Sequence, residues 1–498
     1  MSPFKLTPYL AHPLVCLLSG ALMTFVYAPF SQAWLVFFLL LPLWAVAKLP
    51  DPNTRIWRGL LFGIGYFPIG AYWFVQTLRS YLDYSWPAAL GGHLLITGAC
   101  ALAPCVFAWL AGYCRVRGYT RVLVFAALWL VIEDIRFQAF GGGPWMSLGL
   151  SQVDTPLSGF FPLVGELGTS FFVALTVGLL SMLIDVRRLL LPQLGMIILL
   201  FGGAWGLKQI EWTRAVGEQQ AIGLVQTAVS QQEKQNLATQ VERLKALTDL
   251  TEPLLSKASF IIWPETVVTL ERYNINQHLD RFHQQAMQAR SSVLVGAYEP
   301  AMSGKRYNTA YTLGLEAGQV YQKRHLVPFG EYVPEYLKFL DSYVPGDADR
   351  YHGKYPQLIV NSGVLYGVSI CWEGSFSRDM SPLSRAGAHA LINIANEAWF
   401  AGSTLPGQNL DAMRVRAMEN GRDAVRVANF GPGAIIDFKG RIQQLIDADQ
   451  AAAVTGQLQP RAGSTPFMML GEDLITLTAF CMALLLMVSA RKQDKDEQ

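Results

Sequence analysis

Long stretches without a single charged residue constrain the fold of this chain more than any other feature. Residues 7–47 contain no Lys, Arg, Asp or Glu, and further uncharged apolar runs cover residues 59–78, 84–114, 122–132, 167–184, 189–207 and 474–490. About 20 apolar residues in a helix match the thickness of a bilayer core. We therefore expect a polytopic α-helical membrane bundle.

About eight membrane spans are expected, seven before residue 208 and one after residue 473. Residues 7–47 give two short spans, 12–28 and 32–47, separated at Pro29. The run at 122–132 reaches a spanning length only when it is extended back toward residue 118. A cleaved signal peptide is the alternative for the first span. We expect a retained helix instead, because Lys5 is a weak positive region and a second apolar run follows at once.

The basic residues of the short loops are distributed unequally between the two sides. One alternating set of loops carries twelve Lys and Arg residues, and the other carries two, Arg79 and Arg136. The twelve are Lys5, Lys48, Arg55, Arg58, Arg115, Arg117, Arg121, Arg187, Arg188, Arg491, Lys492 and Lys495. Since loops rich in Lys and Arg stay in the cytoplasm, we expect both termini there and the long segment before the last span outside, in a bacterial periplasm. The net charge of +2 and the absence of a basic run argue against a nucleic-acid partner.

Residues 210–472 have a different composition, with charges at ordinary density and short apolar runs. Strands are expected at residues 221–226, 258–263, 293–298, 309–313, 364–371, 388–394 and 424–429, and helices at 234–250, 275–290 and 409–421. Many of these strands are solid apolar runs, as is typical of strands buried on both faces. Alternating strands and helices predict an external α/β domain with layered sheets and helices.

Of the six cysteines in the chain, one lies in this domain. Cys371 is the only cysteine between residues 210 and 472, so it has no disulfide partner within the domain. An unpaired thiol in an oxidising compartment is either buried or used. The simpler interpretation is a small buried side chain, but its neighbours in the sequence favour chemistry.

Three apolar runs end in polar residues that could form an acyl-transfer site. They are IIWPET with Glu265, YQKRHLVPFGE with Lys323, and VSICWE with Cys371. Functional groups gather at the carboxyl ends of strands in α/β sheets. A carboxylate can take the proton of a thiol as a general base, and an ammonium can stabilise the oxyanion that forms on the acyl carbon. Glu, Lys and Cys at strand ends are by themselves weak evidence.

The same three segments resemble the nitrilase superfamily, whose Glu-Lys-Cys triad they match in order and context. The segment KRHLVPFGEYVP is the most specific of them, and SLGLSQVD, RYNTA, NEAWF and GSTPF also match. Over essentially all 498 residues the chain resembles the apolipoprotein N-acyltransferase family of that superfamily. The resemblance implies a membrane domain at 1–209, a nitrilase-like αββα catalytic domain at 210–472, and a final helix with a cytoplasmic tail at 473–498.

The resemblance also implies roles for individual residues. Glu265 is expected to be the general base, Lys323 to stabilise the oxyanion and Cys371 to be the nucleophile. Glu331 is expected to support the triad, and Glu373 and Trp372 are expected to bind substrate or support the site. His325 is expected to be structural.

A reaction follows from these roles. Cys371 takes an acyl chain from a membrane phospholipid and passes it to the α-amine of a diacylated apolipoprotein, the last step of bacterial lipoprotein maturation. The implied enzyme needs no cofactor and no metal, works as a monomer in the inner membrane, and has its catalytic domain in the periplasm. The chain shows no phosphate-binding loop and no clustered His and Cys ligands.

Several positions depart from the family pattern. Trp372 stands in place of a Tyr, Ala401 and Asn409 in place of a Gly and a His, and Gln235 in place of a Trp. These departures leave open a membrane-tethered nitrilase-type amidase, or an acyltransferase with a different acceptor.

Two further alternatives belong to other classes of protein. A transporter or channel should carry ionisable residues along its spans, whereas His93, with Glu133 and Asp134 at the end of one run, is nearly all that we find. A catalytically inactive scaffold would not need the complete triad.

Overall fold

The chain forms two compact units. The computed structural model describes residues 7–114, 116–139, 142–185, 190–268, 276–301, 305–335, 337–339 and 350–496. Lys5, Arg115, Arg187 and Arg188, which entered the prediction of orientation, lie outside these residues. The first unit comprises Met1–Ile210 and Leu470–Gln498, and the second comprises Glu211–Met469.

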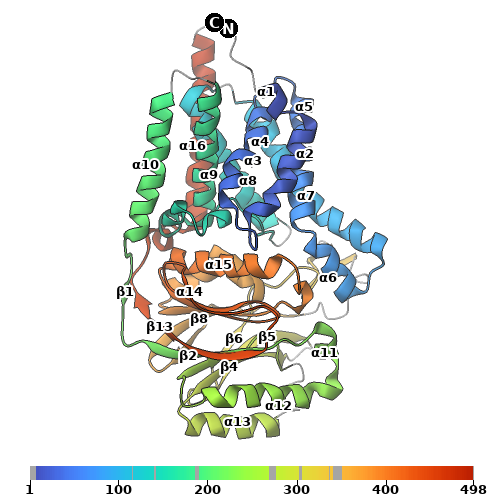
Figure 1. Cartoon of the computed structure of the whole chain (residues 1–498), viewed down its shortest axis with the longest axis vertical. Helices are drawn as coiled ribbons and strands as arrows, with labels where there is room; N and C mark the ends of the chain where they lie inside the picture. The colour runs from blue at the N-terminus through green and yellow to red at the C-terminus, as the bar shows by residue number, and fades with distance from the viewer. Residues whose placement is uncertain are drawn as a thin grey trace. The chain divides into compact units, whose positions relative to one another are not determined.

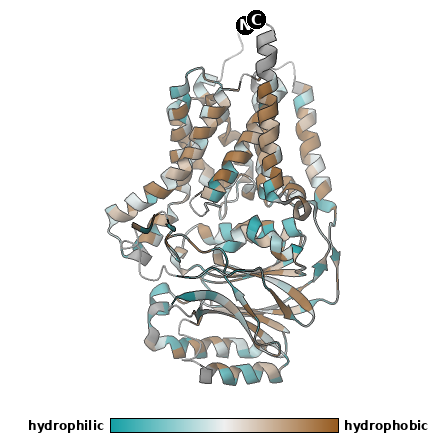
Figure 2. Cartoon of the chain, turned by 180° about the vertical axis from the view of Figure 1, so that it is seen from behind, coloured by the Kyte–Doolittle hydropathy of each residue, from teal (hydrophilic) through white to brown (hydrophobic). Residues whose placement is uncertain are grey.

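The first unit is helical (Figure 1). Its α-helices are α1 (Thr7–Leu10), α2 (Pro13–Leu22), α3 (Val36–Leu39), α4 (Leu41–Val46), α5 (Pro52–Gly70), α6 (Trp73–Leu82), α7 (Trp86–Gly112), α8 (Gly118–Gln138), α9 (Phe161–Asp185), α10 (Leu190–Gln209) and most of α16 (Pro466–Asp496). The longest of them are apolar along most of their length, as the brown ribbon in Figure 2 shows. Side chains such as Leu95, Leu191 and Leu199 are exposed, as expected for helices that face lipid.

Four helices in the described part of the chain are long and apolar enough to cross a membrane, fewer than the eight expected. They span Trp86–Gly112, Pro156–Leu183, Leu191–Gln209 and Pro466–Ser489. The first two expected spans form only the shorter apolar helices Pro13–Val26 and Ala33–Val46. The third is divided between α5 and α6, and the fifth, α8, carries charged residues near both of its ends. Uncharged runs thus indicated apolar helices, but not where those helices break.

Glycines allow α2, α5 and α7 to pack closely. A Cβ added to Gly20 in α2 would lie 2.1 Å from the carbonyl oxygen of Phe62 in α5. A Cβ added to Gly63 in α5 would lie 2.2 Å from the carbonyl oxygen of Ala101 in α7. Small residues at helix contacts are the usual means of association in a membrane, where apolar burial gives no driving force between helices.

The second unit contains two six-stranded sheets. The first has the order β13 (Ala452–Leu458), β2 (Gln220–Gln226), β3 (Phe260–Ile262), β4 (Ser292–Pro300), β5 (Arg306–Gly314), β6 (Val320–Gln322). The second has the order β12 (Ile442–Ile446), β11 (Gly433–Ile436), β10 (Asp423–Asn429), β9 (Ala390–Asn396), β8 (Val364–Ile370), β7 (Leu358–Asn361). β2, β3 and β4 are parallel, as are β8, β9 and β10, while the outer strands are antiparallel. A short pair, β1 (Arg214–Ala215) and β14 (Arg461–Ala462), joins the two ends of this unit.

Three apolar layers hold these sheets together. Phe260 and Ile262 of β3 meet Ile392 and Ile394 of β9 in a core between the sheets. Ile261, on the opposite face of β3, packs with two helices, α12 (Gln240–Thr251) and α13 (Asn276–Gln288). The helices α14 (Ser377–Arg385) and α15 (Leu405–Asn420) cover the outer face of the second sheet in the same way. The central strands are therefore buried on both faces, which is why their sequences are continuously apolar.

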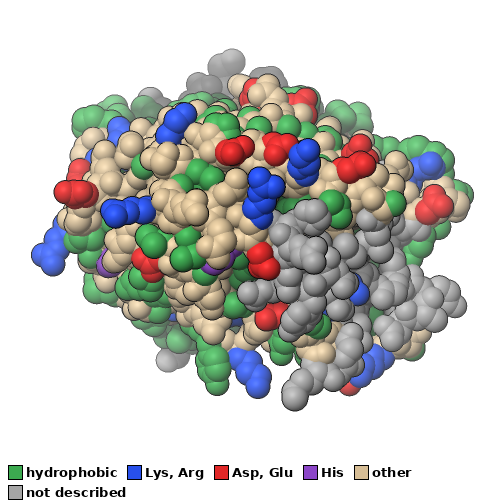
Figure 3. Space-filling model, turned by 90° about the horizontal axis from the view of Figure 1, so that it is seen from below, with side chains coloured by type: hydrophobic (Ala, Val, Ile, Leu, Met, Phe, Trp, Pro, Cys, Tyr) green, Lys and Arg blue, Asp and Glu red, His purple; other side chains and the backbone are tan. Residues whose placement is uncertain are grey.

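Each strand expected from the sequence corresponds to a strand of the structure, within a few residues. The strands that the sequence analysis missed are β1, β6, β7, β11, β12, β13 and β14, which are short, polar or interrupted by glycine. The helix expected at 234–250 is instead two helices, α11 (Gln231–Gln235) and α12, separated by a 3-10 turn. Basic and acidic side chains are interspersed over the face that carries α12 and α13 (Figure 3).

Candidate active site

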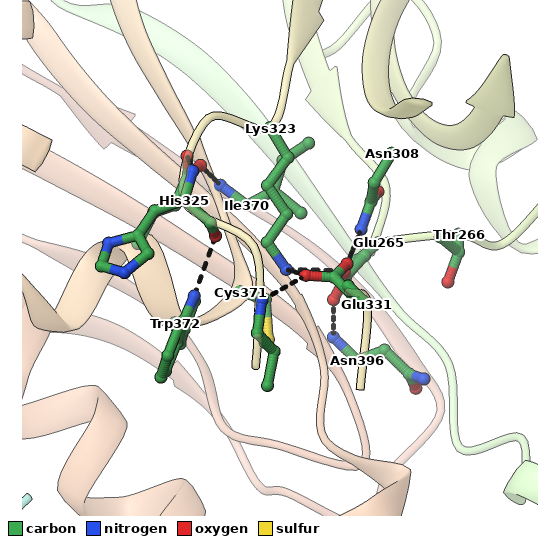
Figure 4. Close-up of polar contacts among 12 residues, drawn as sticks. Glu265, Thr266, Asn308, Lys323, His325, Glu331, Ile370, Cys371, Trp372 and Asn396 are labelled. Carbon is green, nitrogen blue, oxygen red and sulfur yellow. Dashed lines mark hydrogen bonds and ion pairs between the residues drawn. The ribbon is translucent and has the colours of Figure 1, made fainter. Parts of the chain in front are cut away.

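The three residues of the expected triad come together in the second unit (Figure 4). Glu265 follows β3, Lys323 follows β6 and Cys371 follows β8, so each lies just beyond the carboxyl end of a strand. The Lys323 Nζ atom lies 3.8 Å from Glu265 Oε1. The Cys371 thiol is close enough to both charged groups for each to influence its ionisation.

Two donors fix the carboxylate of Glu265, which is only 6% exposed. Asn308 Nδ2 donates to Oε1 at 2.7 Å, and the backbone N–H of Asn396 donates to Oε2 at 2.8 Å. The backbone beside it is also constrained, because the next residue, Thr266, has a positive φ of 47°. A β-branched residue rarely adopts this conformation, so other contacts must hold the loop in place.

A second carboxylate, Glu331, lies on the other side of the lysine. Its Oε2 atom is 2.8 Å from Lys323 Nζ and accepts the backbone N–H of Val327, also at 2.8 Å. Its Oε1 atom accepts from the same Asn308 amide at 3.0 Å. Burial opposes its ionisation, but Lys323 and Arg350 hold the pKa of the Glu331 carboxyl below its usual value.

Charge in the site favours a protonated lysine and a protonated thiol. Burial disfavours the ammonium of Lys323, yet Glu331, Cys371 and Glu265 raise the pKa of Lys323 above its usual value. Burial, together with the charge of Glu265, raises the pKa of the Cys371 thiol, against the opposing effect of Lys323. Since only the thiolate is a strong nucleophile, Cys371 needs a base beside it, and Glu265 is in position to act as one.

A network beneath Cys371 supports its strained backbone. Cys371 has a positive φ of 57° at the point where β8 turns into a 3-10 helix. Asn393 Nδ2 donates to the Cys371 carbonyl oxygen and to Ser369 Oγ, both at 3.0 Å, and Asn393 accepts from Arg426. Arg426 also forms a buried ion pair with Glu397 at 2.5 Å.

Asn409, one of the departures from the family pattern, belongs to this network. Its Nδ2 atom donates to Glu397 Oε1 at 2.5 Å. The carboxylate of Glu397 is tightly enclosed, since a Cβ on Gly431 would lie 1.8 Å from its Oε2 atom. An amide therefore supplies a hydrogen bond to Glu397 at the position where the family has a histidine.

Glu373 and Trp372 join the loop that carries Cys371 to the loop that carries Lys323. Glu373 is fully buried and accepts from Ile370 N at 2.7 Å, Arg324 N at 2.8 Å, His325 N at 3.0 Å and Tyr321 Oη at 2.9 Å. Trp372 Nε1 donates to the His325 carbonyl oxygen at 2.8 Å. The His325 ring pairs with Asp379 at 2.6 Å. All of these contacts join the residues of the two loops to each other or to neighbouring residues of the protein, as expected for side chains that hold loops in place.

Sequence reasoning missed four polar residues of the site. Asn308 bridges the two carboxylates, and the backbone N–H of Asn396 donates to Glu265. Asn393 donates to the Cys371 carbonyl oxygen, and Lys234 reaches the Glu265 loop from α11. Asn308 and Asn396 carried a signal, because they lie within the RYNTA and NEAWF segments that match the family. Among the other departures, Ala401 is exposed, and the side chain of Gln235 lies outside the described residues.

Within the described residues, no group of three or more His, Cys, Asp or Glu side chains is placed to hold a metal ion. The polar groups around Cys371 are instead two carboxylates, an ammonium and several amides. Such a set can deprotonate a thiol and stabilise an oxyanion, which is the chemistry of acyl transfer.

Two family models match parts of the chain. The carbon-nitrogen hydrolase family model matches residues 221–467, and the model of the apolipoprotein N-acyltransferase N-terminal domain matches residues 19–179. The crystal structure of XC1258 from Xanthomonas campestris, a CN-hydrolase superfamily protein, is 20% identical, with a TM-score of 0.37, and covers 49% of this chain and 91% of that chain.

Curated relatives match over nearly the whole length. The apolipoprotein N-acyltransferase of Methylococcus capsulatus is 34% identical over 472 residues, which are 92% of this chain and 92% of that protein. The protein of the same name from Coxiella burnetii is 30% identical over 478 residues, 91% of this chain and 95% of that protein. The chain therefore belongs to the apolipoprotein N-acyltransferase family.

Proposed function

We propose that this enzyme transfers an acyl chain from a membrane phospholipid to the α-amine of the diacylglyceryl-cysteine at the amino terminus of an apolipoprotein. The observation that carries the proposal is the convergence of Cys371 with Glu265 and Lys323 in a chain whose relatives are named apolipoprotein N-acyltransferases. Because burial keeps the thiol protonated at rest, the nucleophile is formed only when a base is in place.

In the first half-reaction, Glu265 takes the thiol proton while the Cys371 sulfur attacks the ester carbonyl of the phospholipid. The Lys323 ammonium stabilises the oxyanion of the tetrahedral intermediate. The ester C–O bond then breaks, Glu265 returns the proton to the leaving alkoxide oxygen, and a lysophospholipid with a free hydroxyl departs. The acyl chain remains on Cys371 as a thioester.

In the second half-reaction, the α-amine of the lipoprotein attacks the thioester. Glu265 takes a proton from the attacking nitrogen, the carbon–sulfur bond breaks, and the proton returns to the Cys371 sulfur. The product is an amide, and the enzyme returns to its starting state. The proposed reaction consumes no ATP or acyl-CoA, and none of its steps requires a metal.

The supporting residues have separate roles in this proposal. Glu331 keeps Lys323 charged and holds it between two carboxylates, as the 2.8 Å ion pair suggests. Glu373 and Trp372 fix the nucleophile loop against the Lys323 loop and act on substrate only through that loop.

We also propose separate roles for the two parts of the chain. Residues 210–472 form the catalytic αββα domain, and residues 1–209 with 473–498 anchor it in the bacterial inner membrane with about eight passes. α5 and α8 contain 19 and 21 residues, which at 1.5 Å per residue span about 30 Å. The catalytic domain is periplasmic, both termini are cytoplasmic, and the enzyme acts as a monomer.

Incubation of the purified enzyme with acyl-labelled phospholipid and no acceptor tests the reaction. About one equivalent of lysophospholipid should be released in a burst, and the label should remain on the protein as a thioester that hydroxylamine removes. Cys371→Ser should give neither product. Peptide mapping should place the label on Cys371.

Addition of a diacylated lipopeptide then separates transfer from hydrolysis. A peptide with a free α-amine should take the label as an amide, while the same peptide with an acetylated amine should leave the thioester intact. Continuous release of free fatty acid without any acceptor would identify a hydrolase and contradict the proposal.

A further inference from the structure

A second buried lysine lies behind the base of the triad. Lys234, on the short helix α11, is only 7% exposed. Its Nζ atom donates to the carbonyl oxygen of Glu265 at 3.0 Å and to Thr266 Oγ1 at 2.6 Å. Buried lysines are rare because their charge must be compensated, and both partners of this one belong to the two residues that form the base loop.

The base loop needs such a contact. The positive φ of Thr266 is a strained conformation for a β-branched residue. β4 approaches the loop so closely that a Cβ on Gly296 would lie 2.4 Å from the Pro264 carbonyl oxygen and 2.7 Å from Glu265 Cα. The loop therefore packs tightly against β4, and the ammonium of Lys234 donates hydrogen bonds to the loop.

The helix that presents Lys234 is itself fixed at both ends. Ser230 and Glu233 form a capping box at its first turn. Arg243 of α12 donates to the carbonyl oxygen of Glu233 at 2.5 Å and to that of Asn236 at 2.9 Å. A helix of five residues has little stability of its own, so these contacts are what place the lysine.

We propose that Lys234 is a positioning residue for the general base: its ammonium holds the Glu265–Thr266 peptide so that the Glu265 carboxylate stays directed at the Cys371 thiol. This inference rests on the proposed function, since it takes Glu265 as the base. Lys234 does not touch the acyl chain and acts only through Glu265.

The charge of Lys234 matters as well as its hydrogen bonds. Burial lowers the pKa of Lys234 to about 7, although the charges of Glu265 and of the Cys371 thiolate oppose this shift. Arg350 and Arg243 contribute to the lowering by repulsion. Below pH 7 the ammonium therefore predominates, and it places a positive charge beside the Glu265–Thr266 peptide.

The test is the burst of lysophospholipid from phospholipid, measured from pH 4.5 to pH 8.5 in the full-length enzyme. Lys234→Met should slow the burst about 100-fold, because a small displacement of a catalytic group has an effect of this size. The loss should be greatest below pH 7 and should shrink above it, because burial lowers the pKa of Lys234 to about 7 and the ammonium charge is lost there.

Two further variants separate charge from hydrogen bonding. Thr266→Val removes the hydroxyl acceptor but keeps the β-branched shape and the charge of Lys234, so it should slow the burst about tenfold with the pH dependence of the wild type. Lys245→Met, which alters an exposed lysine of α12, is the matched control and should behave as the wild type.

The outcomes distinguish this inference from the proposed function. A wild-type enzyme without a Cys371-dependent burst would contradict the proposed function whatever Lys234 does. A normal wild-type burst together with a wild-type rate in Lys234→Met would overturn the role of Lys234. An equal loss of burst rate at every pH in Lys234→Met would also overturn this role, because such a loss indicates only a contribution to folding. If Lys234→Met does not fold, the Thr266→Val variant is decisive. A loss of about tenfold in its burst rate supports the positioning role of Lys234, and a wild-type rate overturns that role.

Discussion

The buried ion pair between Lys323 and Glu331 offers the sharpest test of the site's energetics. The two side chains are 1% and 10% exposed, and their charged atoms are 2.8 Å apart. Glu331→Gln keeps the shape of the side chain and the acceptor for Asn308, but removes the negative charge that faces the ammonium. The change creates no cavity, so its effect reports on charge and hydrogen bonding alone.

The size of the effect follows from burial. Removing one partner of a buried pair costs about 3–5 kcal/mol, because the remaining charge is left uncompensated. Lys323 keeps Glu265 at 3.8 Å, so we expect the lower end, about 3 kcal/mol. For a domain of this size each kcal/mol moves the thermal midpoint by about 2–4 °C, which gives a decrease of roughly 6–12 °C.

The effect should also depend on pH with a definite sign. Lys323 and Arg350 hold the pKa of the Glu331 carboxyl below its usual value, so its stabilisation is complete above the unfolded value of about 4.3. It is lost as the pH falls through the lowered folded-state pKa. The difference in midpoint between the wild type and Glu331→Gln should therefore be full at pH 7 and should decrease below about pH 4.

Thermal unfolding followed by tryptophan fluorescence in detergent measures this difference. The control is Glu335→Gln, which breaks the exposed pair between Glu335 and Lys338, whose atoms are 2.6 Å apart but whose side chains are 84% and 61% exposed. It should leave the midpoint unchanged, since exposed pairs contribute little. Each kcal/mol of stability moves the thermal midpoint by about 2–4 °C. A Glu331→Gln midpoint within about 2 °C of the wild type would therefore refute the assignment of a tightly coupled buried pair.

Three other perturbations have defined outcomes. Glu265→Gln should slow formation of the Cys371 thioester by at least about 100-fold, measured from the intact mass of the protein after incubation with phospholipid; a wild-type rate would exclude Glu265 as the base. Asn393→Ala removes the hydrogen bond to the Cys371 carbonyl oxygen and should slow the burst about tenfold at every pH, whereas an unchanged rate would show that the network below the nucleophile is dispensable. Burial raises the pKa of Asp423 to about 6, so the folded state binds a proton at Asp423 more tightly than the unfolded state does. The thermal midpoint of the wild type should therefore rise relative to that of Asp423→Asn as the pH falls from about 7 to about 5; a constant difference would contradict this.

The sequence was informative wherever a property is local along the chain. Uncharged runs indicate helices that avoid water, and solid apolar runs such as residues 293–298 indicate strands buried on both faces. The ends of such runs also pointed to Glu265, Lys323 and Cys371, because polar residues directly after buried strands lie at one edge of a sheet. Breaks within apolar segments, such as that between α5 and α6, were not visible.

The supporting residues could not be found in the same way. Asn308 lies within a strand, Asn393 within a fully buried one, and Lys234 on a polar helix that would ordinarily face water. Each acquires its role from a partner far along the chain: Asn308 is 43 residues from Glu265, and Lys234 is 31 residues from it. No local pattern encodes such a pairing.

The sequence by itself determined that this chain has an apolar helical part and an α/β part, and which residues carry reactive groups. It could do so because burial imposes a composition on each segment independently of its neighbours. Only the tertiary structure decided that β13 pairs with β2, that one asparagine bridges two carboxylates, and that Lys323 rather than Lys234 lies between them. These arrangements arise because most buried polar groups in a fold are paired, and each can pair with whichever group the fold brings near, at any distance along the chain.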